Sequence, residues 1–232
     1  MPEGKEASSH PWRRHDLVRV APDVWASALA DCPSAAETPL LRTWADKGWP
    51  AIIRRRAERE DPRLAPVGVP LPPAAGKRRV ALLVPPDSIL RRSPPPLLRA
   101  AASVANSSWR STIASILGLG ERIGVEPSVF GGLMWQHQTG LTYLSPRSDL
   151  DLLWPVPAGF DVLSLVSGIA QIQSDAPMRI DGEIIFPDGG AVHWQELRNA
   201  HQAGHEAGVL AKTMAGVRFF DASSLPGIGR HA

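Results

Sequence analysis

Short alternating runs of apolar and polar residues predict β-strands in the first part of the chain. Four runs fit this pattern: residues 15–20, 50–54, 64–71 and 79–84. Successive side chains of a strand point to opposite faces, so such runs suit a half-buried sheet. Two helices are expected between them, one that opens at Pro22 and buries Trp25 and Leu29, and one over residues 40–47 that ends at Gly48.

A proline-rich stretch over residues 85–96 interrupts this pattern. It contains Pro85-Pro86 and Pro94-Pro95-Pro96, and such segments are typical of extended connectors. We therefore expect a small N-terminal α+β domain at residues 1–90 and a second domain at residues 97–232.

The second domain is expected to combine helices with a sheet. The pattern predicts helices over residues 97–117, interrupted at 106–108, and over 160–173, and strands over 148–153, 178–186, 190–194 and 219–220. Residues 195–203 and the segment around Val209 and Leu210 are expected to be helical or mixed. Pro187-Asp188-Gly189 is typical of a hairpin turn. The expected fold class is therefore α+β.

Two carboxylates placed two residues apart carry the clearest chemical signal. Asp149 and Asp151 lie in the run SDLDLL, where a strand would turn both side chains to one face while leucines anchor the segment. Like charges this close are costly unless a cation or a proton lies between them. Mg²⁺ prefers oxygen ligands and commonly takes one or two carboxylates together with substrate phosphates. The pair therefore predicts a magnesium site.

A later strand offers a third carboxylate. Asp181 and Glu183 are again two residues apart, in the run MRIDGEIIF. If that strand lies beside the strand of Asp149 and Asp151, three carboxylates meet, which is the arrangement used in two-metal phosphoryl chemistry. The alternative is an exposed hairpin whose acidic residues face solvent.

Gly131 and Gly132 are candidates for the phosphate side of such a site. A backbone without side chains lets a phosphate approach the amide groups closely. Arg147, two residues before Asp149, is a further candidate phosphate contact. The alternative for Arg147 is an ordinary loop arginine in solvent.

Composition and charge exclude several other function classes. The chain has 25 Lys and Arg against 23 Asp and Glu, a formal charge of +2, which is too balanced for bulk attraction to nucleic acid. The single cysteine, Cys32, excludes an internal disulfide and suits a reducing compartment. No apolar run approaches the roughly 20 residues of a membrane helix, and the N-terminal segment has no apolar signal region. We expect a soluble cytoplasmic protein that binds neither nucleic acid nor membrane.

Other catalytic motifs have less support. His193, His201 and His205 are compatible with zinc, but the His-Glu-x-x-His pattern is absent. His15-Asp16 suggests a catalytic dyad, but no Gly-x-Ser-x-Gly segment supplies its nucleophile. The absence of Gly-x-Gly-x-x-Gly argues against a Rossmann dinucleotide site.

The order of these motifs resembles that of the nucleotidyltransferase superfamily of polymerase-β-like enzymes. Within it, the chain is most similar to the phosphoribosyl-dephospho-CoA transferases of malonate decarboxylase, also called holo-acyl-carrier-protein synthases. The segments that carry the resemblance are residues 14–17 (RHDL), 49–55 (WPAIIRR), 66–69 (PVGV), 139–141 (TGL), 148–153 (SDLDLL), 179–181 (RID) and 210–213 (LAKT). The family usually has Gly-Ser where this chain has Gly131-Gly132, so backbone N–H groups would replace the serine hydroxyl.

This resemblance implies a nucleotidyltransferase-like domain with a mixed β-sheet flanked by helices, and a defined reaction. A serine of the apo acyl-carrier subunit of malonate decarboxylase would attack 2'-(5''-triphosphoribosyl)-3'-dephospho-CoA and displace diphosphate. Such chemistry depends on positioning and charge neutralisation.

The resemblance also implies roles for individual residues. Asp149 and Asp151 would hold Mg²⁺, and Asp181 would hold a second ion and accept the serine proton. Gly131 and Gly132 would cradle the leaving phosphates. Lys212 would stabilise the diphosphate as a point charge.

Two alternative functions stay open. One is a nucleotidyltransferase with a different acceptor, such as an antibiotic, a nucleotide or the carrier of citrate lyase. The other is a non-catalytic module that binds a carrier protein. The residues alone do not reveal the acceptor.

Overall fold

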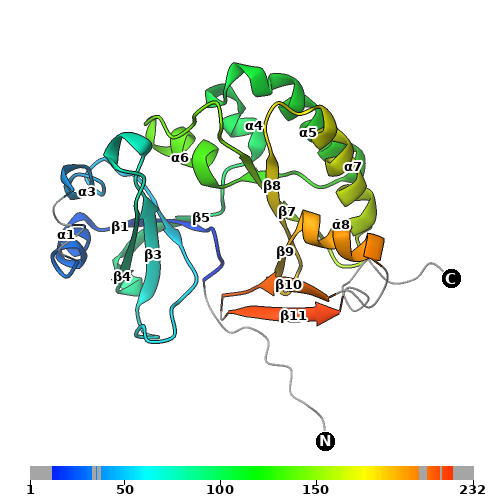
Figure 1. Cartoon of the computed structure of the whole chain (residues 1–232). Coiled ribbons are helices and arrows are strands. Elements are labelled where there is room, and N and C mark those ends of the chain that lie inside the picture. Colours follow the sequence, from blue (N-terminus) through cyan, green and yellow to red (C-terminus); the bar gives the residue numbers. More distant parts are fainter. Residues whose placement is uncertain (1–11, 33–34, 36–37, 204–207, 215, 222–232) are drawn as a thin grey trace, which may run out of the picture.

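The computed structural model describes residues 12–32, 35, 38–203, 208–214 and 216–221. These residues form two sheets with helices packed against them (Figure 1), which confirms the expected α+β class. Among the described residues, no helix is long and apolar enough to span a membrane.

The N-terminal sheet is antiparallel throughout and has the order β4-β3-β2-β1-β5. Its strands are β1 (Leu17–Val20), β2 (Ala51–Ile53), β3 (Ala65–Pro70), β4 (Arg79–Val84) and β5 (Ile89–Ser93). The helices of this part are α1 (Pro22–Ala30) and α3 (Pro39–Arg42), with short 3₁₀ turns at Pro73–Ala75 and Pro86–Ser88. As expected, Trp25 and Leu29 form the buried side of α1.

The C-terminal sheet is mixed and has the order β11-β10-β9-β8-β7-β6. Its strands are β6 (Ser128–Val129), β7 (Leu150–Pro155), β8 (Ile180–Ile185), β9 (Ala191–His193), β10 (Gly208–Lys212) and β11 (Val217–Asp221). Strands β7 and β8 run parallel, because helix α7 (Val162–Asp175) carries the chain back between them. The remaining neighbours pair antiparallel.

Helices pack around the C-terminal sheet. They are α4 (Leu98–Ala101), α5 (Arg110–Ile123), α6 (Gly131–Thr139), α7 and α8 (Trp194–Ala203), with 3₁₀ turns at Ala102–Val104 and Ser107–Trp109. Figure 1 shows α5, α7 and α8 on the outer side of this sheet, with the N-terminal part on the other side. Leu150, Leu152 and Trp154 of β7 are fully buried, and Asp151 between them points to the opposite face.

A continuous hydrophobic core joins the two parts of the chain. Trp44 from the N-terminal part packs edge-on against Trp135 of α6, with ring centroids 6.0 Å apart. The hydroxyl of Tyr143 donates to the Pro70 carbonyl at 2.9 Å, and both groups come from different parts of the fold. The two sheets are therefore held against each other by packing as well as by the connecting chain.

Three segments differ from the sequence-based expectation. Strand β5 occupies the proline-rich stretch that we expected to be a connector, and it pairs with β1 along the sheet edge. The second helix is shorter than residues 40–47, because Trp44 is fully buried and its indole N–H donates to the Pro50 carbonyl. Val209 and Leu210 lie in a strand, with Val209 buried and Leu210 exposed, as alternation allows.

Candidate active site

The register of β7 and β8 brings Asp151 beside Asp181. The two residues are direct partners on adjacent parallel strands, so their side chains project from the same face of the sheet. Asp149 lies just before β7. The structure thus brings together the three carboxylates that the sequence singled out.

The backbone at Gly131 is shaped to receive the Asp151 carboxylate. Gly131 is the first residue of α6 and has a φ of +60°. A Cβ atom there would lie 1.9 Å from Asp151 Oδ2, and the next amide, that of Gly132, donates a hydrogen bond to Asp151. The carboxylate therefore occupies the N-terminus of α6, the end of a helix that attracts negative charge.

This environment changes the protonation of Asp151. Burial, followed by the charges of Asp181 and Asp149, raises the pKa of Asp151 to about 7, against the smaller opposing effects of the Gly132 amide and Arg179. A raised pKa means that the ionised form lacks a counter-charge at this position. A cation beside Asp151 would supply one.

Arg179 bridges the other two carboxylates. Its Nη2 atom lies 2.8 Å from Asp149 Oδ2 and 3.0 Å from Asp181 Oδ2. The guanidinium is more than half exposed, at 57% of its side-chain surface. An exposed arginine can leave such a pair at little cost.

His193 of β9 fixes the protonation of Asp181. Its Nδ1 atom accepts the backbone N–H of Gln195 at 3.1 Å, so the ring proton lies on Nε2 and is donated to Asp181 Oδ1. This hydrogen bond is the main reason that the pKa of Asp181 lies below its usual value, against the opposing effect of burial. Asp181 is therefore ionised at neutral pH, whereas Asp151, with a pKa of about 7, is partly protonated there.

Glu183 forms a second charged cluster two residues further along β8. It is 4% exposed and lies within ion-pair distance of Arg14, His15 and Lys212. Burial alone would raise its pKa, but the His15 hydrogen bond and the charges of Arg14 and His15 hold it well below the usual range of a glutamate. Lys212 contributes a further hydrogen bond from Nζ at 2.9 Å.

Arg147 lies apart from these contacts, in the exposed turn before β7. Its backbone amide donates to Ser145 Oγ, and its side chain is exposed. Its proposed contact with phosphate stays a prediction.

The oxygen ligands of this site suit magnesium, although a metal would have to compete with Arg179. Among the described residues, no three His, Cys, Asp or Glu side chains already form a metal-ligand group. Mg²⁺ needs only one or two carboxylates when phosphate and water complete its shell, and Asp151 beside Asp181 offers them. The zinc hypothesis depended partly on His205, which lies outside the described residues.

Sequence reasoning missed several members of the site. Arg179 could have been found, since alternation puts it on the same face as Asp181. Arg14 and Glu183 could not have been paired, because 169 positions separate them. His193 was considered only as a zinc ligand.

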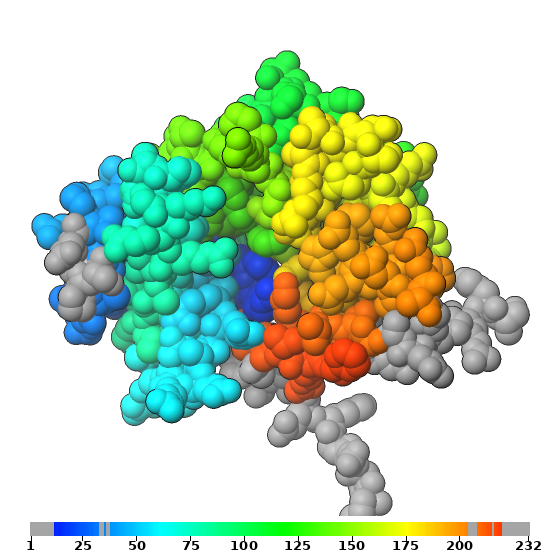
Figure 2. Space-filling model, in the orientation of Figure 1, coloured from blue at the N-terminus to red at the C-terminus, as the bar shows by residue number. Residues whose placement is uncertain are grey.

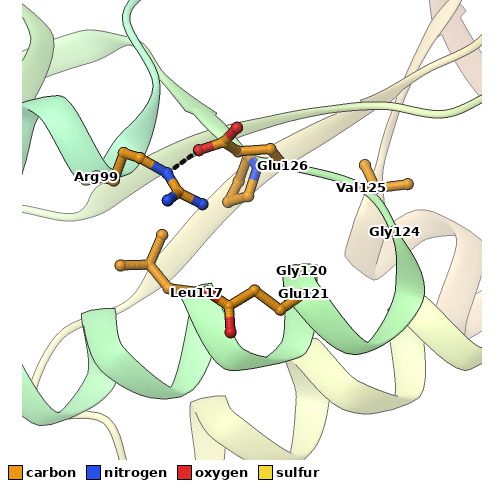
Figure 3. A pocket seen from close by; sticks show the side chains of 8 residues that line it. Arg99, Leu117, Gly120, Glu121, Gly124, Val125 and Glu126 are labelled. Atoms are coloured by element: carbon orange, nitrogen blue, oxygen red, sulfur yellow. Dashed lines mark hydrogen bonds and ion pairs between the residues drawn. The ribbon is translucent and has the colours of Figure 1, made fainter.

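A hollow lies between the two parts of the molecule on the face drawn in Figure 2. Figure 2 shows this hollow between the cyan part of the chain and the yellow and orange part, with the dark-blue segment that follows residue 11 at its bottom. A separate pocket lies at the end of α5 and is lined by Arg99, Leu117, Gly120, Glu121, Gly124, Val125, Glu126 and Pro127 (Figure 3). None of the carboxylates of the site lines that pocket.

Gly131→Ala tests how closely the backbone holds Asp151. We expect a loss of about 1–3 kcal/mol in the free energy of unfolding, because the residue has a positive φ and its Cβ would collide with the carboxylate. Denaturant unfolding measures this loss. Gly140→Ala is the matched control, since Gly140 has a φ of +72° and open space around it. Equal losses in both variants would show that Asp151 is not held against Gly131.

Comparison with known proteins places the chain in a family. Residues 97–223 match the family model described as phosphoribosyl-dephospho-CoA transferase MdcG C-terminal domain, and residues 13–95 match the corresponding N-terminal domain. No solved structure matches the chain significantly.

Curated relatives agree with these models. A protein of Bradyrhizobium diazoefficiens named phosphoribosyl-dephospho-CoA transferase is 40% identical over 81% of this chain and 82% of its own length. A protein of the same name from Xanthomonas campestris pv. campestris is 36% identical over 91% of this chain and 95% of its own length. The resemblance inferred from the sequence motifs is thus confirmed, and the chain belongs to the phosphoribosyl-dephospho-CoA transferase family.

Proposed function

We propose that this chain attaches a phosphoribosyl-dephospho-CoA group to a carrier protein. The donor is 2'-(5''-triphosphoribosyl)-3'-dephospho-CoA, and the acceptor is a serine of the apo acyl-carrier subunit of malonate decarboxylase. The reaction takes place in the cytoplasm, where the single Cys32 stays reduced.

The observation that carries this proposal is the pairing of Asp151 with Asp181 beside the start of α6. Carboxylates on neighbouring strands, next to backbone amides at a helix N-terminus, suit a substrate that brings both phosphate and a hard cation. Family membership supplies the identity of the transferred group. A nucleotidyltransferase-like course of the C-terminal sheet is part of the same proposal.

The bond changes balance without a further co-reactant. The serine oxygen attacks the α-phosphorus of the donor, and the bond from that phosphorus to the oxygen bridging to the β-phosphate breaks. Diphosphate leaves with the bond electrons, and the carrier keeps a phosphodiester. The serine proton passes to Asp181, which the hydrogen bond from His193 keeps ionised.

The remaining residues position and neutralise the donor. Asp149, Asp151 and Asp181 would hold Mg²⁺, which supplies charge neutralisation for the triphosphate when bound. For the amides of Gly131 and Gly132 to face phosphate oxygens, the Gly132 amide would have to exchange its hydrogen bond to Asp151 for one to the phosphate. Lys212 and Arg147 would contact the leaving diphosphate.

The proposal predicts which acceptor is modified. Purified chain, Mg²⁺ and the triphosphate donor are incubated separately with apo carrier of malonate decarboxylase, apo carrier of citrate lyase, a nucleotide and an aminoglycoside. We expect the malonate decarboxylase carrier to gain the mass of one phosphoribosyl-dephospho-CoA group, at least about tenfold faster than the citrate lyase carrier. Intact-protein mass spectrometry measures the gain.

The other outcomes separate the alternatives. Modification of a different acceptor would replace the assigned carrier. Carrier binding without modification, in the presence of donor and Mg²⁺, would show a non-catalytic module. The control is the same carrier with its acceptor serine changed to alanine, which must stay unmodified.

A further inference from the structure

The N-terminal part of the chain reaches into the site through Arg14 and His15. Both residues lie just before β1, and both contact Glu183 on β8 of the C-terminal sheet. His15 also packs its ring on Phe130, the residue before Gly131, with centroids 4.8 Å apart. The two residues therefore connect the Gly-Gly turn with the acidic strand.

The charges in this cluster do not balance. One buried carboxylate, Glu183, faces the guanidinium of Arg14, the ammonium of Lys212 and the imidazole of His15. Even with a neutral His15, the cluster keeps one surplus positive charge. Lys212 is partly hydrated, with 43% of its side chain exposed, but Arg14 is largely buried, with 17% exposed. A largely buried charge is costly unless a counter-charge compensates it, so the surroundings of Arg14 favour an additional anion.

Arg14 has one terminal nitrogen whose hydrogen bonding is incomplete. Its Nη2 donates to Glu183 Oε1 at 3.2 Å. Its Nη1 lies 3.1 Å from Oε2 but is buried without a properly directed hydrogen bond among the described residues. A guanidinium carries five N–H donors in a planar fork that matches phosphate oxygens. Within the described residues, Nη1 is thus a donor of this fork that still lacks a properly directed acceptor.

The cluster lies on the catalytic face of the C-terminal sheet. Glu183 is two residues from Asp181, so both side chains project from the same face of β8. His193 of β9 is the direct strand partner of Glu183 of β8. Lys212 lies on the next strand, β10, opposite Ala191 of β9. An anion held by Arg14 and Lys212 would thus lie next to the carboxylates.

We propose that Arg14 binds the leaving diphosphate together with Lys212, and that Glu183 positions both cations. The active site is then composite, since the N-terminal part supplies a substrate contact. This inference rests on the proposed function, because diphosphate is the group that the transfer releases. It extends that function by giving a residue of the N-terminal part a role in substrate binding.

Binding of inorganic diphosphate tests the inference without requiring transfer. The full chain is titrated calorimetrically with sodium diphosphate in the presence of MgCl₂. Arg14→Gln is expected to weaken binding by about tenfold to a hundredfold, the usual effect of losing a charge-assisted hydrogen bond. Arg14→Lys, which keeps the charge but loses the fork, should fall between Arg14→Gln and wild type. Arg13→Gln is the matched control, because Arg13 is the exposed neighbour, and its affinity should stay within about twofold of wild type.

The possible results separate this inference from the proposed function. Equal diphosphate affinity in Arg14→Gln and wild type overturns the inference, as does equal weakening in Arg13→Gln. No diphosphate binding by the wild type overturns it as well. Thermal melts identify a misfolded Arg14→Gln, in which case Arg14→Lys decides. Modification of a carrier by the wild type is measured in a separate experiment. Failure of the diphosphate-binding claim and failure of the transfer claim can therefore be told apart.

Discussion

Replacing Asp151 with asparagine is expected to reduce transfer to the carrier by about a thousandfold. Asp151 faces Asp181 across the β7–β8 pair and rests on the start of α6, so its charge lies where a metal-bound triphosphate would need it. Losing several kcal/mol of charge stabilisation corresponds to a rate loss of about this size. The measurement is kcat/KM for donor consumption with saturating carrier and Mg²⁺.

The stability of the same variant gives an independent check. Burial and like charges raise the pKa of Asp151 to about 7, so wild type loses stability as the pH rises through that value. Asn cannot ionise, and Asp151→Asn should therefore melt at or above the wild-type temperature at pH 8 in metal-free buffer. Asp175→Asn, at the exposed end of α7, is the control for activity. An Asp151→Asn enzyme with near-normal kcat/KM would refute the role of this carboxylate in transfer.

Glu183→Gln is expected to be the most destabilising polar substitution in the site. Removing one partner of a buried ion pair typically costs about 3–5 kcal/mol, since the other charges stay behind. Glu183 is 4% exposed and faces Arg14 and Lys212. For a chain of this size, we expect the melting temperature to fall by about 6–15 °C at pH 7.

The pH dependence of this loss follows from the pKa of Glu183. Its carboxylate is held ionised below the usual pKa of a glutamate, so its stabilising contribution is complete above about pH 4.5 and declines as the pH falls further. The difference in melting temperature between wild type and Glu183→Gln should therefore become smaller at acidic pH. Glu58→Gln, at an exposed position, should have the same melting temperature as wild type at each pH. A difference between wild type and Glu183→Gln that stays constant down to pH 3 would contradict the ion-pair account.

The sequence indicated which carboxylates share a face because alternation along a strand is a local rule, whereas their meeting depended on how the two strands pair. Alternation along a strand puts Asp149 and Asp151 on one face, and the parallel neighbour then brings Asp181 into register. Glycine at position 131 was expected to allow a close approach. In the structure the approaching group is the Asp151 carboxylate, where the sequence had suggested a phosphate.

The outer part of the site depends on tertiary structure and could not be derived locally. The contact of Arg14 with Glu183 forms only when the two sheets pack together. The segment around Val209 and Leu210 was expected to be helical or mixed. It forms strand β10 instead, and the sheet brings the ammonium group of Lys212 at the end of that strand to Glu183. Strand β5 was hidden by its flanking prolines, because pairing with β1 outweighs the local preference for an extended connector.

The most direct test of the central claim is the location of a metal in the donor complex. Crystals of the chain with Mn²⁺, which stands in for Mg²⁺ at oxygen ligands, and a non-hydrolysable triphosphate donor would show the metal by anomalous scattering. The account predicts a peak about 2.1 Å from carboxylate oxygens of both Asp151 and Asp181, with Arg179 displaced from at least one of its partners. A donor bound without metal at these residues, or Arg179 still bridging Asp149 and Asp181 in the complex, would contradict it.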